Sequence, residues 1–115
     1  MKKYLYLFRG GDGRNVNQSP QQMQEHMEKW GVWMNGLNEK GILDSGLPLA
    51  NEGKVVAKKG QDITDGPFAE GAEIVGGYLI VNAKNLEEAT NFSKECPIFE
   101  YEGTVEVREI SSMEM

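Results

Sequence analysis

A chain of 115 residues that is 39% hydrophobic and 26% charged has the composition of one ordinary globular domain, which excludes an intrinsically disordered protein. Its 18 acidic and 12 basic side chains give a net charge of −6, which repels phosphate backbones and argues against a nucleic-acid partner. The longest apolar stretches fall far short of the ~20 residues that cross a bilayer, so we expect no membrane partner either.

The single cysteine and the N-terminus both bear on the compartment. Cys96 cannot form an internal disulfide, and the first apolar run, which follows two lysines, ends without a small-residue cleavage site. These features predict a cytoplasmic protein with one domain over residues 1–115. Cys96 has an acidic neighbour and no evident base, so we interpret it as structural.

The first predicted element is a strand over residues 3–8, whose side chains alternate with a period of two. Both of its faces are apolar, with Leu5 and Leu7 on one and Tyr4, Tyr6 and Phe8 on the other. Such a strand should be covered on both sides. A polar, glycine-rich segment over residues 9–15 follows, and we interpret it as a mobile loop over the mouth of a pocket.

A long helix is predicted next. Ser19 is its N-cap, Pro20 its first residue, and Gln22 is placed to close a capping box. The helix should end near Lys40, before Gly41. Its apolar stripe, which we expect to pack on a sheet, comprises Met23, Met27, Trp30, Met34 and Leu37.

The second half of the chain contains mainly strands. We predict strands over residues 42–49, 73–81 and 104–110, a short edge hairpin arm at 55–57, a turn at 64–68 and a helix over 86–95. This order matches an α+β, ferredoxin-like split βαβ sandwich with an extra hairpin. Both helices then lie on one side of the sheet, and the other side is bare apolar surface. A second copy is the simplest cover, so we expect a homodimer.

His26 and Trp33 lie on the shoulder of the long helix, where the core meets solvent or a pocket. The only histidine, His26, is a candidate general base near neutral pH, and the alternative is a half-buried structural residue with one hydrogen bond. Trp33 is either a core residue or part of an aromatic-lined ligand pocket. Both alternatives stay open from the sequence.

Three carboxylates, Asp65, Glu70 and Glu73, fall within nine residues and are candidates for an acid–base cluster or a metal site. Because their spacing matches no known ligand pattern, we expect a turn aspartate with solvated glutamates, and no metal or other cofactor. In the last strand, Glu106 and Arg108 alternate with valines. They should face the dimer side, either paired at its rim or lining a ligand cavity between the two sheets.

The order of several motifs resembles a known family. Residues 64–70 contain Asp65-Gly66-Pro67-Phe68, and they are followed by the apolar run 76–81, by Glu95-Cys96-Pro97 and by residues 105–110. This set is similar to the YCII-related family, in its branch with the DGPF motif, over nearly the whole chain. The resemblance implies a dimeric α/β barrel, in a superfamily that includes isomerases, lyases and monooxygenase-like proteins acting on small organic molecules.

The resemblance also bears on candidate residues. Simpler YCII proteins have a histidine and an aspartate regarded as a catalytic pair. Asp65 matches the aspartate directly, whereas the position of the histidine falls near Trp30, one turn after His26. Relatives with the DGPF motif often occur with sigma factors of the extracytoplasmic type, which suggests a regulatory role.

Two functions follow as hypotheses. The first is a homodimer that binds a small organic ligand, with acid–base chemistry of the lyase or isomerase kind by Asp65 and His26, and with Phe68, Trp33, Glu106 and Arg108 at the ligand. The alternative is a non-catalytic binding or regulatory module linked to transcription. There Asp65 caps its turn, Gly66 relieves backbone strain and Phe68 fills the core.

Overall fold

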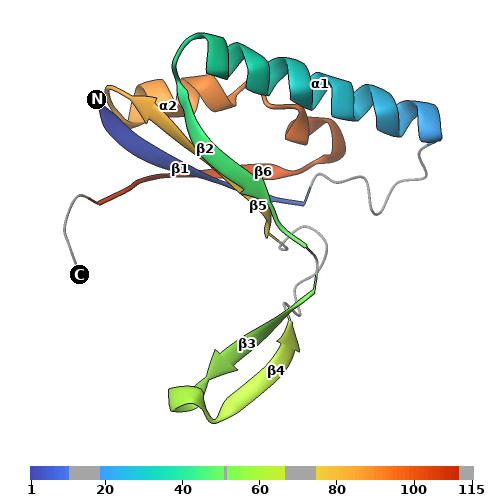
Figure 1. The fold of residues 1–115 in the computed structure, drawn as a ribbon, viewed down its shortest axis with the longest axis vertical. Helices are drawn as coiled ribbons and strands as arrows, with labels where there is room; N and C mark the ends of the chain where they lie inside the picture. Colours follow the sequence, from blue (N-terminus) through green and yellow to red (C-terminus); the bar gives the residue numbers. More distant parts are fainter. Residues whose placement is uncertain (11–18, 51, 67–74, 112–115) are drawn as a thin grey trace.

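The computed structural model describes residues 1–10, 19–50, 52–66 and 75–111. Its elements are β1 (Lys2–Arg9), α1 (Pro20–Glu39), β2 (Leu43–Pro48), β3 (Gly53–Ala57), η1 (Lys58–Gly60), β4 (Asp62–Gly66), β5 (Val75–Ala83), α2 (Leu86–Ser93), η3 (Pro97–Tyr101) and β6 (Thr104–Glu109). Four strands form an antiparallel sheet in the order β2-β5-β1-β6, and both helices lie on one face of it (Figure 1). This is the ferredoxin-like split βαβ order, so the predicted α+β fold is confirmed.

The two central strands, β1 and β5, decide which face of the sheet is the core. The side chains that are buried under the helices are Tyr4, Tyr6 and Phe8 on β1 and Leu79, Val81 and Ala83 on β5. The Tyr6 hydroxyl donates a hydrogen bond to the carbonyl of Ala89 in α2, and the Tyr6 ring stacks on Trp33 of α1 at 6.4 Å. The aromatic side of the first strand therefore meets the helices, and its leucine side is left open.

Helix α1 begins as the sequence predicts. The Ser19 side chain accepts from the Gln22 amide at 3.1 Å, and the Gln22 side chain accepts from the Ser19 amide at 2.8 Å, which completes the capping box. The helix ends at Glu39, with Lys40 as C-cap and Gly41 at a φ of +72°, a conformation that glycine adopts without strain.

The predicted apolar stripe of α1 is partly wrong. Met23 and Met27 are 51% and 63% exposed, because the first turns of α1 extend past the end of the sheet (Figure 1). The face of α1 that packs on the sheet is instead rotated away from Met23 and Met27 and toward His26, which is only 5% exposed. Residues His26, Trp30, Trp33 and Leu37, at spacings of four, three and four, form that face.

The extra hairpin differs from its prediction in two ways. Strands β3 and β4 pair only with each other, in a two-stranded sheet that projects from the body on the side opposite the helices, and not at an edge of the main sheet (Figure 1). The turn predicted at residues 64–68 is also wrong over its described part. Thr64, Asp65 and Gly66 are strand residues of β4 and pair with Val55, Lys54 and Gly53. We call residues 53–66 the hairpin arm.

The remaining elements agree with the sequence apart from one short helix. The C-terminal strand and the second helix lie within a few residues of their predicted bounds, and the short helix η3 after Cys96 was not predicted. Most of the glycine-rich loop, from residue 11 on, lies outside the described residues. Within the part of the chain that is described, no helix is both long and apolar enough to cross a membrane.

Candidate functional site

The open face of the four-stranded sheet has an apolar centre. Leu5 is paired with Ile80, and Leu7 with Tyr78, so these four side chains project from the same face of neighbouring strands. All four are only half-buried. On the next strand Leu47, which is paired with Tyr78, is 62% exposed. The open face is therefore an apolar surface that no described segment of the chain fully covers. We call these five residues the apolar patch.

A cluster of charges borders the apolar patch on the side of β6. Glu106 is paired with Leu7, and Arg108 with Leu5, so both project from the open face, as the alternation of the last strand predicts. Arg9 forms an ion pair with one oxygen of the Glu106 carboxylate, and Arg108 Nε lies 3.8 Å from the other oxygen. Two guanidinium groups thus share one carboxylate, which leaves one positive charge in excess beside the patch.

The motif aspartate belongs to the same side of the sheet. Asp65 lies in β4 and is paired with Lys54, one residue from the base of the hairpin arm, where the arm joins the body on the open-face side (Figure 1). The next motif residues, Pro67 and Phe68, lie outside the described residues. So do the other two carboxylates of the predicted cluster, Glu70 and Glu73.

His26 lies on the opposite side of the sheet, under the helix layer, and both of its ring nitrogens have partners. Trp30 Nε1 donates to His26 Nε2 at 3.1 Å, and His26 Nδ1 lies 3.2 Å from Glu100 Oε1. Because an indole N–H can only donate, Nε2 must be the accepting nitrogen and Nδ1 carries the proton toward Glu100. The Tyr101 ring lies 4.7 Å from the imidazole, centre to centre. The lone pair that a general base would use is therefore already occupied.

Glu100 joins this histidine to a lysine. Lys29 Nζ lies 2.5 Å from Glu100 Oε2, and the two contacts connect α1 to η3. The ion pair with Lys29, assisted by the hydrogen bond from His26, holds the pKa of the Glu100 carboxyl below its usual value. The same pair raises the pKa of Lys29. These contacts connect α1 to η3, and the charge of Glu100 is balanced by that of Lys29.

The structure thus separates the two predicted acid–base residues. His26 is buried in the helix layer, whereas Asp65 lies in an arm that projects from the other side of the sheet (Figure 1). Trp33, one of the predicted ligand-binding residues, lines a groove between α1 and α2 on the outer surface of the helix layer. Sequence reasoning missed Glu100 and Tyr101, since they follow His26 by more than seventy residues and no local pattern joins them.

A reactive cysteine and a metal site are the two other kinds of chemistry that the sequence raises. Cys96 is 3% exposed, and its burial raises the pKa of the thiol to about 12, so the prediction that it is not a reactive thiolate is supported by its surroundings. Within residues 1–10, 19–50, 52–66 and 75–111, no three histidine, cysteine or carboxylate side chains are grouped as metal ligands would be.

Comparison with known proteins gives a family and several solved structures. The family model described as the YCII-related domain matches residues 5–114. No curated protein matches the chain. Among solved structures, it is similar to 5-chloro-2-hydroxyhydroquinone dehydrochlorinase from Burkholderia phenoliruptrix AC1100, in a complex with 2,5-dihydroxybenzoquinone. The identity is 14% and the TM-score 0.49, over 95% of this chain and 93% of that chain, and this likeness carries no argument about function.

Proposed function

The chain belongs to the YCII-related family, and from its own geometry we propose that it is a homodimer that binds a small organic acid against the open face of its sheet. The observation that carries the proposal is the apolar patch, bordered by the charges of Arg9, Glu106 and Arg108. The motif Asp65-Gly66-Pro67-Phe68 supports placing the chain in the DGPF branch of the family.

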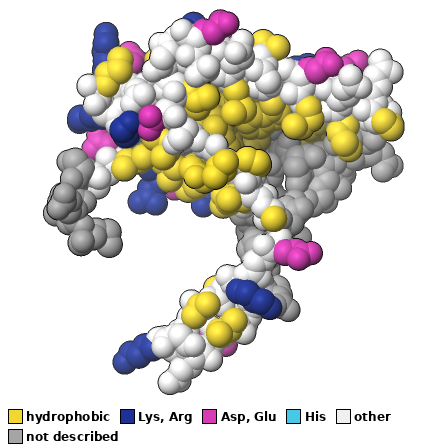
Figure 2. Space-filling model, viewed as in Figure 1, with side chains coloured by type: hydrophobic (Ala, Val, Ile, Leu, Met, Phe, Trp, Pro, Cys, Tyr) yellow, Lys and Arg dark blue, Asp and Glu magenta, His cyan; other side chains and the backbone are white. Residues whose placement is uncertain are grey.

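A second copy is proposed because two separate surfaces need a cover. The apolar patch lies at the centre of a sheet whose other face is packed under helices. The hairpin arm exposes Val55, Val56 and Ile63 at 45%, 59% and 61%, and Figure 2 shows hydrophobic side chains on the surface of the arm. A two-stranded hairpin alone is marginally stable in water, so an arm with apolar side chains calls for a partner surface. Packing sheet against sheet gives a dimeric α/β barrel.

The proposed ligand follows from the charges beside the patch. An apolar or aromatic body matches Leu5, Leu7 and Ile80, and an acidic group matches the excess positive charge of Arg9 and Arg108 over Glu106. Arginine is suited to this role because its planar group donates two parallel hydrogen bonds to a carboxylate. The ligand would lie between the two sheets of the dimer.

Acid–base chemistry, which the proposal includes, is assigned to Asp65 alone. His26 is on the other side of the sheet, and its accepting nitrogen is bound to Trp30. Asp65 is in the arm on the ligand side. For a substrate found among aromatic acids, Asp65→Asn should abolish turnover and retain binding, because an amide cannot accept a proton at neutral pH. Undiminished turnover in this variant would exclude Asp65 as the acid–base group.

The dimer is tested by light scattering coupled to size-exclusion chromatography. The wild-type protein should elute with twice the mass of the chain. Leu7→Asp, which places a charge in the apolar patch, should be monomeric with an unchanged circular dichroism spectrum. Val32→Asp is the matched control, since Val32 is 75% exposed on α1, and it should stay dimeric. A monomeric wild-type protein at its highest soluble concentration would refute the proposal.

The ligand is tested with 8-anilinonaphthalene-1-sulfonate, an aromatic anion whose fluorescence rises in apolar surroundings. Titration of the dimer should saturate. Arg108→Ala should lower the affinity for the probe about tenfold while the protein stays dimeric, because one of two guanidinium groups is lost. Lys94→Ala, which removes an exposed cation just after α2, is the control and should bind the probe as the wild type does. Equal loss in both variants would show a nonspecific charge effect.

A further inference from the structure

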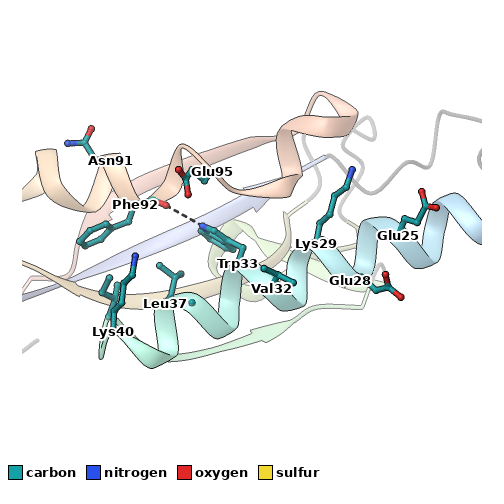
Figure 3. A pocket seen from close by; sticks show the side chains of 12 residues that line it. Glu25, Glu28, Lys29, Val32, Trp33, Leu37, Lys40, Asn91, Phe92 and Glu95 are labelled. Carbon is teal, nitrogen blue, oxygen red and sulfur yellow. Dashed lines mark hydrogen bonds between the residues drawn. The ribbon is translucent and has the colours of Figure 1, made fainter.

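A groove of about 780 Å³ lies between α1 and α2 on the outer surface of the helix layer (Figure 3). It is remote from the open sheet face, because the helices cover the opposite side of the sheet (Figure 1). Its volume is within the range of sites for small molecules. The lining comes from Glu25, Glu28, Lys29, Val32, Trp33, Gly36, Leu37 and Lys40 of α1 and its C-cap, from Ile42, and from Asn91, Phe92 and Glu95.

The indole of Trp33 is fixed in the middle of this groove. Its N–H donates to the carbonyl of Phe92 at 3.3 Å, which joins the two helices and satisfies the one polar atom of the ring (Figure 3). Tyr6 stacks on it from the core at 6.4 Å. The half-buried ring is therefore held in one orientation, and what it offers to the groove is apolar π surface rather than a hydrogen-bond donor.

Gly36 keeps the groove open at a cost to the helix. Glycine in a helix interior is less favourable than alanine by about 1 kcal/mol. At Gly36 no packing reason offsets that cost, because a Cβ built there meets no described atom within 4 Å. The space that a side chain would occupy belongs to the groove. Gly31 has the same open surroundings but does not line the groove, so it serves as an internal control.

The charges around the groove favour a cation. Three carboxylates line it, Glu25, Glu28 and Glu95, against the two ammonium groups of Lys29 and Lys40. Lys29 is already paired with Glu100, which leaves the carboxylates in excess. Glu95 follows α2 and lines the groove across from Trp33 of α1, whereas Lys40 lies by the C-terminus of α1 (Figure 3). An ammonium group bound there would be attracted both by the π face of the indole and by a carboxylate.

From these features we propose that the groove between α1 and α2 is a binding site for a small organic cation, an amine carried on an aromatic or other apolar body. The apolar part lies on Trp33 and Phe92, and the ammonium group lies toward Glu95. This site is separate from the one proposed on the open sheet face, and it takes a ligand of the opposite charge.

The first test compares two probes with the same phenyl body, 2-phenylethylammonium and 3-phenylpropionate, by ¹H–¹⁵N spectroscopy of the two indole N–H groups. The ammonium probe should shift the Trp33 signal to saturation, with a Kd on the order of 1 mM for so small a molecule. The Trp30 signal, whose N–H is bonded to His26, should move little. Equal or stronger binding of the carboxylate would overturn the proposed ligand class.

The second test fills the groove. Gly36→Leu should lower the affinity for the ammonium probe at least about tenfold, because the new side chain occupies the space of the ligand. Gly31→Leu adds the same side chain on another face of α1 and should leave binding unchanged. Glu95→Gln should weaken the ammonium probe alone. If Gly36→Leu is folded by circular dichroism and binds the probe as the wild type does, the groove is not the site.

The two proposals fail separately. Leu7→Asp, made to disrupt the dimer, lies on the other face of the sheet and should leave the ammonium probe bound with unchanged affinity. A loss of the ammonium probe in Leu7→Asp would place its site at the dimer interface and overturn the assignment to the groove.

Discussion

The two faces of the central strand β1 are both apolar but have different surroundings. On β1, Tyr4, Tyr6 and Phe8 are between 0% and 6% exposed, whereas the alternating Leu5 and Leu7 are only half-buried. Both sets are apolar, so hydrophobicity alone does not distinguish them. The difference comes from the connections between strands, because both helices return to one side of the sheet. A strand that is apolar on both faces therefore indicates that two covers are needed, and only one of them is built from this domain's own helices.

Polar groups differ between the faces as well. On the covered face, the Tyr6 hydroxyl is bonded to a backbone carbonyl of α2, and its burial raises the pKa of this phenol. On the open face, Arg9, Glu106 and Arg108 form a charged cluster beside leucines. The buried hydroxyl on the covered face is thus satisfied by a hydrogen bond within the chain, whereas the open face has charged side chains at its surface.

The largest difference between the faces should appear at two adjacent residues of β5. Leu79 is 4% exposed on the covered face, so Leu79→Ala should lower the free energy of unfolding by about 2–5 kcal/mol. Ile80 faces the open side, and Ile80→Ala should cost about 1 kcal/mol or less in the isolated chain. Urea-induced unfolding in dilute solution, where the proposed dimer would be dissociated, measures both.

The same pair also reports on the second copy. At high protein concentration the loss of unfolding free energy in Ile80→Ala should increase, because the proposed dimer would bury this side chain, whereas the loss in Leu79→Ala should not depend on concentration. If the two variants lose the same unfolding free energy in dilute solution, the two faces of the sheet are buried equally, which would contradict the difference between them.

Two glycines sharpen the contrast at smaller magnitude. A Cβ at Gly46 would lie 2.3 Å from Leu79 Cδ2 and 2.5 Å from the carbonyl oxygen of Tyr78, so Gly46→Ala should destabilise the protein by about 1–3 kcal/mol. Gly76, on β5 at the alternation of the open face, has no described atom within 4 Å of such a Cβ. Gly76→Ala should be neutral or stabilising by about 0.5 kcal/mol. Thermal unfolding of both variants checks this, and a destabilised Gly76→Ala would indicate a cover on that face.

Much of the fold could be predicted from local patterns. The capping box at Ser19 and Gln22, the two-sided alternation of β1 and the position of β5 each follow from a few neighbouring residues. The reversal of the hairpin arm could not be predicted. Asp65-Gly66 is a typical turn pattern, yet the chain reverses at Lys58 and Lys59, which adopt φ values of +51° and +60°. Gly60, at a φ of +89°, is the one residue of this reversal that favours a turn, whereas lysine rarely adopts a positive φ and so does not indicate one.

The candidate sites were less predictable than the fold. The alternation in β6 predicted that Glu106 and Arg108 share the open face, because strand geometry alone fixes it. The surroundings of His26 depend on Glu100, which is brought to it by the connection after α2. The groove beside Trp33 depends on how closely α1 and α2 approach, and on the missing side chain at Gly36. Distances between elements are set by packing, which a single sequence does not display.

The smallest of the three effects concerns the partly exposed charges between α1 and η3, where Glu100 joins His26 and Lys29. Since its pKa is lowered in the folded protein, Glu100 stabilises the fold above its unfolded pKa, and that contribution is lost as the pH falls through the folded value. Glu100→Gln retains an acceptor for His26 but no charge. Its free energy of unfolding should therefore be lower than that of the wild type at pH 7, and the gap should close as the pH falls below the ordinary glutamate pKa of about 4.3 and through the lowered folded pKa.

Urea unfolding at a series of pH values measures this gap, and Lys29→Met should reproduce it because it removes the same ion pair. The raised pKa of Lys29 adds a second limit, since its stabilisation is present below the unfolded pKa and is lost as the pH rises through the folded value. The gap should thus be widest between the two limits. A gap that stays constant from neutral to acidic pH would mean that the hydrogen bonds, and not the charges, connect α1 to η3, and that only the open face of the sheet depends on charge.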